Sequence, residues 1–410
     1  MQTSNELVVD GLSLEGMVPG YLSTLASFLQ SQLPDAWQWF HSDRFTSDDV
    51  ESVRLDLLRS TVRIDRDKND RVYRIVDAVA TKLELDVQVT LYQVQNPTGW
   101  NAAAMPVTDH AHLLIEGPLL KEFGDEELTA VLSHELAHVL LWRIDDRRHR
   151  TTLRLLDALC DDAGATEAHL ESGRLCRLHT EVFCDRVACH IIGNPLPAIA
   201  SLIKVGTQSS DVDPQAYLRQ ADEIFAAENV KSDQVTHPEL HIRARALKLW
   251  SDKAPNLDQV ISQMIMGDVE LDRLDLIQRD KLGELTLRTM DAILRHEWLR
   301  TDAALAHTRL FDDQYQWKRL SMKDLKSLAF KISKQHESVQ QFIAYLLLDF
   351  ATTERELEDL PLAASMELAE RFKISDRFRE IARKELKMRV KQWNALDETK
   401  LDLLAKAEAK

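Results

Sequence analysis

The stretch DEELTAVLSHELAHVLLW, residues 125–142, decides how the rest of this chain is interpreted. Apolar side chains lie on nearly every side of it, which is typical of a helix buried inside a protein. Asp125 is the predicted N-cap, and the acidic residues after it suit the positive end of a helix dipole. His134 and His138 are four residues apart, so both imidazoles lie on one helix face and can reach one cation.

The segment from His134 to His138 has the HExxH spacing, in which two histidines bind zinc. Glu135 between them is then placed to accept a proton from metal-bound water. The alternative is a surface helix with incidental histidines. Apolar neighbours on both sides of the motif, such as Val131 and Leu140, favour a buried helix and therefore a metal site.

A catalytic zinc takes three protein ligands and keeps one position open for water. Glu181 lies in TEVFCDRVACHII, residues 180–192, a predicted helix that ends at the Gly-Asn-Pro of residues 193–195. Asp185 follows one turn later, so Glu181 could bind the metal while Asp185 hydrogen-bonds a ligand histidine from behind. Such acidic pairs are also common on solvated helix faces. Cys184 and Cys189 are rival ligands, although buried helix cysteines usually serve as small apolar packing residues.

The rest of the sequence predicts a mainly helical protein with a small sheet. Residues 16–85 have helical spacing, whereas residues 86–94 alternate as a strand does and residues 111–117 form a second extended candidate. NPTGWN, residues 96–101, is a predicted turn. Residues 251–410 have few strand signals and indicate successive amphipathic helices. The expected fold class is therefore α+β, predominantly α, with a metal-binding domain at 1–250 and an all-helical domain at 251–410.

Composition excludes several classes of protein. The 410 residues carry a formal net charge of −16, which disfavours nucleic-acid binding. No apolar stretch is long enough to span a membrane, and no secretory signal is readable at the start. Four cysteines in a chain of this length do not make a disulfide framework, so we expect a cytoplasmic protein.

The order of these parts resembles peptidase family M48, the zinc metallopeptidases that include the Ste24 and HtpX types. The similarity covers roughly residues 50–250, and many members of the family are embedded in membranes, so this chain resembles a soluble branch. Four segments carry it: the NAxA-like residues 101–106, the HExxH of residues 134–138, an ExxAD-like Glu181 to Asp185 in which Cys184 replaces the usual Ala, and a THPxxxxR-like Thr236-His237-Pro238 followed by Arg243.

The resemblance implies a zincin-like domain that holds one Zn²⁺ per chain, with roles for individual residues. His134, His138 and Glu181 would be the zinc ligands, Glu135 the base, and Asp185 the group that orients His134. Asn101 and Ala102 would lie beside the strand that binds substrate, and Arg243 would also serve substrate binding. The alternatives are that Asn101 merely caps a turn and that Arg243 is a surface charge.

His237 precedes Pro238 at a predicted loop-to-helix junction, because Pro is well tolerated at a first helical position. Two catalytic roles suit a histidine there. It could donate a hydrogen bond to the oxyanion of the reacting peptide, or it could occupy the fourth zinc position and keep the enzyme latent. The alternative is a simple helix-start residue.

Two functions follow. The first is a zinc endopeptidase whose protein or peptide substrate adds as a strand to an exposed edge around His110 to Glu116. The second is a non-catalytic, zinc-stabilised binding or chaperone-like module whose helical C-terminal half recruits a protein partner. Glu135 disfavours the second, since a structural site needs no base.

In the C-terminal half, residues 346–375 resemble the TerB-like helical domain of tellurite-resistance proteins, in which an acidic turn precedes a helix. Asp349 precedes Thr353 and Glu356 here. Thr353 and Glu356 also have the spacing of a capping box, and an ordinary helix-turn-helix in a bundle is the alternative.

Overall fold

The computed structural model describes residues 8–9, 12–13, 16–42, 50–107 and 110–409. The chain divides into two compact units, Met1–Gly267 and Asp268–Lys410. This division falls later than the expected boundary near residue 250, because the helix α12 (Leu257–Met266) packs into the first unit. Ile261 and Ile265 of α12 share a buried cluster with Leu178 and Ile242.

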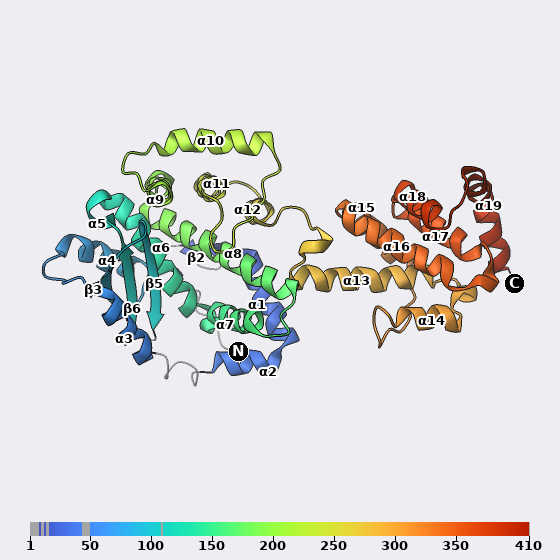
Figure 1. Cartoon of the computed structure of the whole chain (residues 1–410), viewed down its shortest axis with the longest axis horizontal. Helices are drawn as coiled ribbons and strands as arrows, with labels where there is room; N and C mark the ends of the chain where they lie inside the picture. The colour runs from blue at the N-terminus through green and yellow to red at the C-terminus, as the bar shows by residue number, and fades with distance from the viewer. Residues whose placement is uncertain (1–7, 10–11, 14–15, 43–49, 108–109, 410) are drawn as a thin grey trace. The chain divides into compact units, whose positions relative to one another are not determined.

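The first unit combines a small sheet with many helices (Figure 1). Its strands are β1 (Val8–Val9), β2 (Leu12–Ser13), β3 (Thr61–Arg63), β4 (Gln88–Val94), β5 (Asn101–Val107) and β6 (His110–Glu116). Its helices are α1 (Gly20–Gln32), α2 (Pro34–His41), α3 (Val50–Ser60), α4 (Asp70–Lys82), α5 (Leu119–Glu122), α6 (Asp125–Arg143), α7 (Arg148–Asp161), α8 (Glu167–Ile192), α9 (Pro195–Thr207), α10 (Pro214–Ala227), α11 (Leu240–Ser251) and α12. The expected fold class, α+β and predominantly α, is confirmed.

The sheet that carries the site has four strands in the order β3-β4-β6-β5. β4 and β6 are parallel, and β5 and β6 are antiparallel with Asn101 opposite Glu116 and Val107 opposite His110. β6 is therefore an inner strand and β5 an edge strand. The expectation that residues around His110 to Glu116 form the exposed edge is wrong. The strand β5 begins at Asn101, the last residue of the predicted turn, and covers that side of β6.

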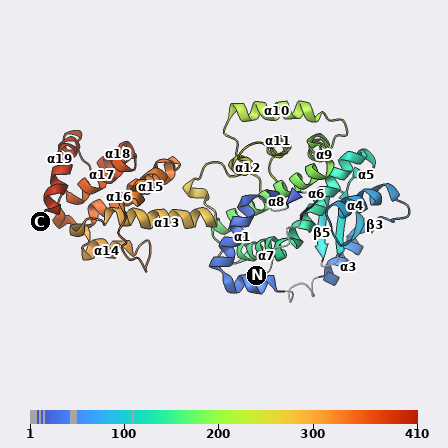
Figure 2. The same cartoon turned by 180° about the vertical axis from the view of Figure 1, so that it is seen from behind.

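Helix α6 packs between the sheet and helix α8, so it is buried on most sides. Leu132, Leu136 and Leu141 have no exposed surface, and burial of each such side chain contributes about 1.5–3 kcal/mol. Its N-cap is Gly124, whose N–H donates to Glu127 Oε2 at 2.9 Å, and Asp125 is the first helical residue rather than the predicted cap. Figures 1 and 2 show α6 and α8 running past the sheet in the interior of the unit.

Helix α8 ends where the sequence predicts. Gly193 adopts φ +74°, the left-handed conformation that favours glycine, and the Asn194 side chain accepts from the Leu196 N–H to start α9. Pro195 fills the first position of α9, where a missing N–H costs nothing. After this short junction, α9 packs beside α6 and forms one wall of the candidate site.

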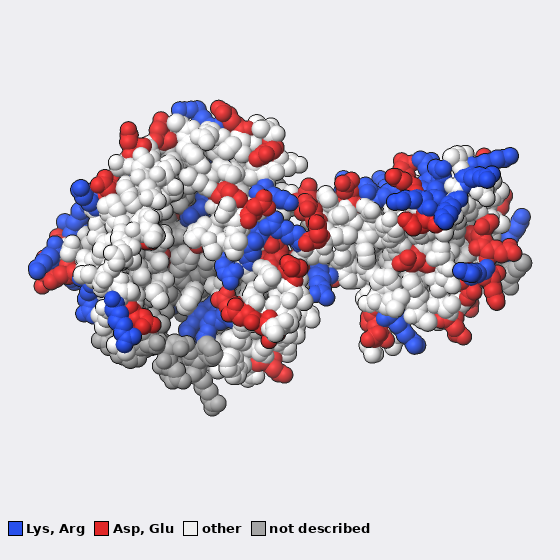
Figure 3. Space-filling view, viewed as in Figure 1, with Lys and Arg blue, Asp and Glu red and all other residues white. Residues whose placement is uncertain are grey.

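The second unit has helices and no strand among its described residues, and the segments that join the helices are irregular or turns. Its helices are α13 (Leu276–Ile293), α14 (Asp302–Thr308), α15 (Met322–Ser333), α16 (Glu337–Thr353), α17 (Leu360–Arg371), α18 (Ser375–Glu385) and α19 (Val390–Glu408). Thr353 is the last residue of α16 and donates to the Asp349 carbonyl, so the predicted capping box with Glu356 is wrong. Figure 3 shows acidic and basic side chains intermixed over the visible face of each unit.

Among the described residues, no helix has both the length and the apolar character needed to cross a membrane.

Candidate metal centre

Two helices bring three side chains together. His134 and His138 lie one turn apart on α6, and their ring centroids are 5.2 Å apart. The Nε2 atoms of the two rings face Glu181 of α8, at 3.2 Å from its Oε2 and 3.5 Å from its Oε1 respectively. The predicted ligand set therefore converges on one point, although its members come from helices far apart in sequence.

The Glu181 carboxylate has the character of a metal ligand. It is buried, and its Oε2 accepts no well-aligned hydrogen bond. Burial alone would raise the pKa of Glu181, but pairing with His134 and the charges of His138 and Arg243 outweigh it and lower the pKa. The carboxylate is thus buried and ionised, with Oε2 3.2 Å from His134 Nε2 and 3.5 Å from Arg243 Nη2, and it can partner a cation placed between the two rings. Two imidazole nitrogens and this carboxylate thus fit a divalent metal.

The imidazoles differ in their electrostatic surroundings. Burial tends to lower the pKa of His134, but hydrogen bonds to Asp185 and Glu181 raise it to about 10. Burial lowers the pKa of His138 to about 4. Without a metal, protonated His134 and Arg243 together balance the carboxylates of Glu181 and Asp185. A divalent cation at the Nε2 atoms would balance the same charge.

Cys184 is a further donor at this point. Its Sγ and one ring nitrogen from each of His134 and His138 all lie within 4.8 Å of one another. Burial raises the pKa of the Cys184 thiol well above its ordinary value. The Glu181 oxygens lie 3.2 and 3.5 Å from the two histidine nitrogens and the carboxylate is already ionised, whereas the Cys184 thiol would have to lose a proton, so Glu181 suits the third ligand position better than its rival Cys184. Cys189, with its pKa raised by burial to about 11, is not part of this group.

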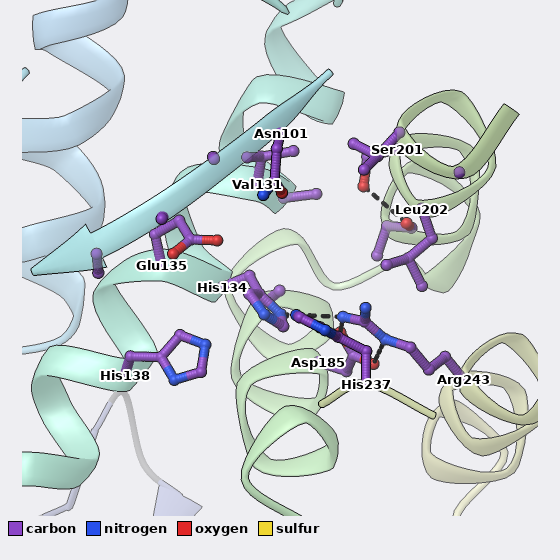
Figure 4. Close-up of a pocket in the computed structure, with 18 of the residues that line it drawn as sticks. Asn101, Val131, His134, Glu135, His138, Asp185, Ser201, Leu202, His237 and Arg243 are labelled. Carbon is purple, nitrogen blue, oxygen red and sulfur yellow. Dashed lines mark hydrogen bonds and ion pairs between the residues drawn. The ribbon is translucent and has the colours of Figure 1, made fainter. Parts of the chain in front are cut away.

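Asp185 and Arg243 form a buried support behind His134. Asp185 Oδ1 lies 3.0 Å from His134 Nδ1 (Figure 4). This contact leaves His134 Nε2 directed toward Glu181. Arg243 of α11 donates to Asp185 through Nε at 2.8 Å and Nη2 at 2.7 Å. Arg243 also lines the cavity, but its bidentate pairing gives it a role that the sequence did not predict, holding Asp185 in place.

Glu135 of α6 is buried beside the edge strand β5. Burial raises its pKa to about 7, against the opposing effects of the His134 charge and a hydrogen bond from the Ala104 backbone. A carboxyl group with a pKa near neutrality can both take up and release a proton. Its contact with Ala104 also places it directly beside β5.

The edge strand β5 presents backbone groups to the cavity. Residues of an antiparallel strand alternate between pairing with the neighbour and pointing away from it. The Ala104 N–H points to Glu135, so Ala102 points outward in the same way. Asn101 and Ala102 both line the cavity. The cavity has a volume of about 580 Å³.

His237 lies in the loop before α11 and not at a helix start, since α11 begins at Leu240. Its Nδ1 is 2.9 Å from the Thr236 hydroxyl, and its Nε2 is 3.5 Å from Glu181 Oε2. The side chain is 57% exposed. The structure thus brings His237 to the metal-binding side of the cavity on an accessible loop.

Two features of the site carried no recognisable signal in the sequence. Arg174 of α8 fixes the loop that carries His237, because it donates to the carbonyls of Ser232 and Gln234 while pairing with Glu171. Helix α9 supplies one wall of the cavity. Both depend on contacts between segments distant in sequence, which no local motif encodes.

The comparison with known families agrees with this geometry. Residues 66–159, the segment from α4 through most of α7, match the family model described as peptidase family M48. No curated protein and no solved structure matches the chain. The matched segment contains His134, Glu135 and His138 within its sheet and helix framework. This segment, which carries three residues of the candidate metal centre, is thus similar to peptidase family M48, whose members are metal-dependent proteases.

Proposed function

We propose that this protein is a zinc-dependent endopeptidase that cleaves extended protein or peptide chains. The observation that carries the proposal is the convergence of two imidazole Nε2 atoms on the buried Glu181 carboxylate, with Glu135 beside them under an edge strand. Two histidines and a glutamate are a ligand set that catalytic zinc sites use. One Zn²⁺ per chain is expected.

Bound zinc would supply a Lewis acid that polarises the peptide carbonyl and makes the attacking water more acidic. His134, His138 and Glu181 would hold it, and Asp185 would keep His134 in the tautomer whose Nε2 is free to bind. Glu135 would accept a proton from the attacking water and deliver it to the nitrogen of the leaving amine. A pKa near neutrality suits both halves of that transfer.

The substrate would bind as an added strand on β5. The outward N–H and carbonyl of Ala102 and the outward carbonyl of Ala104 would pair with its main chain, as in other cases of strand addition. Backbone pairing does not depend on the side chains of the substrate. Any preference for particular substrate side chains would therefore come from the residues that line the cavity. The resemblance to M48 implies substrate contacts at Asn101, which the exposed start of β5 supports.

A non-catalytic, zinc-stabilised module is the second candidate, and one observation favours it. Cys184 could complete a closed set of four protein donors with His134, His138 and Glu181, as structural zinc sites do. Glu135 is buried beside the metal-binding residues and contacts the backbone of β5. A structural zinc site would not require a carboxyl group at this position. The catalytic proposal therefore accounts for more of the structure.

The two candidates separate in one experiment. Zinc content by mass spectrometry and casein digestion are measured for wild type, Glu135→Gln and Glu126→Gln. Glu126 lies on the same helix but is exposed, so its variant is a matched control. The endopeptidase predicts zinc in all three proteins and digestion by all except Glu135→Gln. Zinc without digestion in every protein would favour the non-catalytic module.

A further inference from the structure

One part of the cavity, here called the hollow, is lined by residues that the proposed chemistry does not use. Ala130 of α6, Ala188 of α8 and Ala198 of α9 line it. Each of these alanines is itself at least nine-tenths buried, so they lie where the three helices converge. Because an alanine side chain ends at Cβ, three of them leave a space that larger side chains would fill.

The walls of the hollow are apolar. Leu202 and Val205 of α9, Val131 of α6 and Leu240 of α11 line it. Ser201 also lines it, but its hydroxyl donates to the Ala198 carbonyl of its own helix at 2.8 Å (Figure 4). Ser201 therefore has its donor already engaged and adds little polarity to the wall.

No unpaired charge is directed into this part of the cavity among the described lining residues. Asp185 and Arg243 line it, yet they form a bidentate pair with each other. A charged side chain entering the hollow would lose its hydration without gaining an opposite partner, which is costly. An apolar side chain would gain the burial of its surface.

The position of the hollow along β5 identifies which part of a substrate reaches it. Asn101, at the first residue of β5, lies beside Ser201 and Leu202, whereas His138 lies on the other side of Glu135 (Figure 4). Antiparallel pairing is the more stable arrangement of two strands. A peptide antiparallel to β5 runs toward Asn101, so the residue after the cleaved bond lies on the side of the hollow.

We propose that this hollow binds a bulky apolar side chain of the substrate residue immediately after the cleaved bond, and that Ala198 and Leu202 of α9 set its size and polarity. The proposal rests on the proposed endopeptidase function and adds a substrate class to it. The protein would thus cleave extended chains before residues such as Leu and Phe.

The test uses a set of peptides that differ only at one central position, with Leu, Phe, Ala, Lys or Asp. Cleavage by the full-length protein is followed by mass spectrometry, which locates the cut bond. Cleavage before Leu and Phe is expected to exceed cleavage before Lys and Asp by about 10-fold or more in kcat/KM. Equal cleavage at all five residues, or a preference at the residue preceding the cut, would overturn the proposal.

Two substitutions on α9 probe the hollow itself. Ala198→Leu fills the space and should reduce the preference for Phe over Ala by about 10-fold. Leu202 is only partly buried, so Leu202→Lys should be tolerated and should raise cleavage before Asp relative to Leu. Ala226→Leu makes the same change as Ala198→Leu on the exposed surface of α10 and is the matched control. Circular dichroism verifies that each variant is folded, and an unaltered preference in a folded Leu202→Lys protein would contradict the assignment.

Measurements of peptide binding test the hollow independently of the proposed peptide hydrolysis. Affinities of the same five peptides for the Glu135→Gln variant are measured by fluorescence anisotropy with fluorescein-labelled peptides. Tighter binding of the Leu and Phe peptides supports the hollow even if wild-type protein cleaves nothing, in which case only the proposed hydrolysis fails. Cleavage without any preference leaves the endopeptidase in place and eliminates the hollow as its specificity site.

Discussion

Asp185 Oδ1 lies 3.0 Å from Nδ1 of His134, and this contact fixes which nitrogen of the imidazole faces Glu181. The neutral ring can carry only one N–H, so a carboxylate that accepts from Nδ1 leaves Nε2 as the nitrogen with a lone pair. Arg243 holds Asp185, and Asp185 in turn holds His134, so that a buried chain of contacts ends at the metal position.

Asp185→Asn should weaken zinc binding by about 10- to 100-fold, because an amide accepts more weakly and can present its NH₂ group to the ring. The measurement is a zinc titration with a competing chelator. Asp211→Asn, the same change at an exposed residue, should bind zinc like wild type. Equal affinity in both variants would mean that Asp185 does not orient the ligand.

Glu181→Ala should lose zinc, whereas Cys184→Ala should retain it. The carboxylate lies within 3.5 Å of both histidine Nε2 atoms and is ionised, while burial keeps the thiol protonated. Metal content after dialysis against zinc-free buffer distinguishes the two. Retention of zinc by Glu181→Ala and its loss from Cys184→Ala would reverse the assignment and make Cys184 the third ligand.

Arg243→Lys should lower zinc affinity, because a single ammonium cannot replace the two nitrogens that hold Asp185. The sequence alone suggested a substrate contact for Arg243. A substrate contact predicts a raised KM for peptides with zinc affinity unchanged. Chelator titration and steady-state kinetics of Arg243→Lys therefore distinguish a substrate contact from support of Asp185.

His237→Ala tests the two catalytic roles. Its Nε2 is 3.5 Å from Glu181 Oε2, close enough to the metal position for either an oxyanion donor or a fourth ligand. As a donor, its loss should reduce kcat by about 10²–10³ with zinc content unchanged. As a latch, its loss should raise turnover. Unchanged kcat would leave His237 with neither role.

Stability at mildly acidic pH should depend on His149 of α7. Burial lowers the pKa of this side chain from 6.5 to about 4. Between these values the unfolded chain binds a proton that the folded chain does not, so the free energy of unfolding falls as the pH falls. The loss is about 1.4 kcal/mol per pH unit.

The measurement is urea unfolding at pH 7 and pH 5, in EDTA so that loss of metal does not contribute. His149→Gln should reduce the difference in unfolding free energy between these pH values by about 2 kcal/mol. His110→Gln, which replaces an exposed histidine, is the control. The same pH difference in His149→Gln as in wild type would exclude this histidine as the cause.

Local patterns in the sequence predicted the parts of the site that lie within one element. The spacing of His134 and His138 fixes their common face on any helix, and the Gly193 junction fixes the end of α8. The bidentate pairing of Arg243 with Asp185 could not be predicted from the sequence, since it depends on how α11 packs against α8.

Strand order was the main error in the sequence interpretation. The sequence of β6, His110 to Glu116, contains a short apolar run that does not distinguish an edge strand from an inner strand. β6 is an inner strand because β5 pairs along it. Strand pairing depends on contacts between separate segments, so the sequence of β6 alone does not reveal it. The alanine-rich β5 gave little strand signal because alanine is depleted in strands.

The edge strand β5 also bears on how copies of this protein behave toward one another. An unpaired strand edge is a template for association with other strands, and proteins limit this hazard by keeping such edges short or placing proline in them. Pro106 has no N–H, and the strand ends at Val107. The outward hydrogen-bonding stretch is thereby confined to the part of β5 nearest Asn101. A flexible chain can lie along so short a stretch, whereas two folded copies meeting edge to edge would share too few hydrogen bonds to aggregate through it.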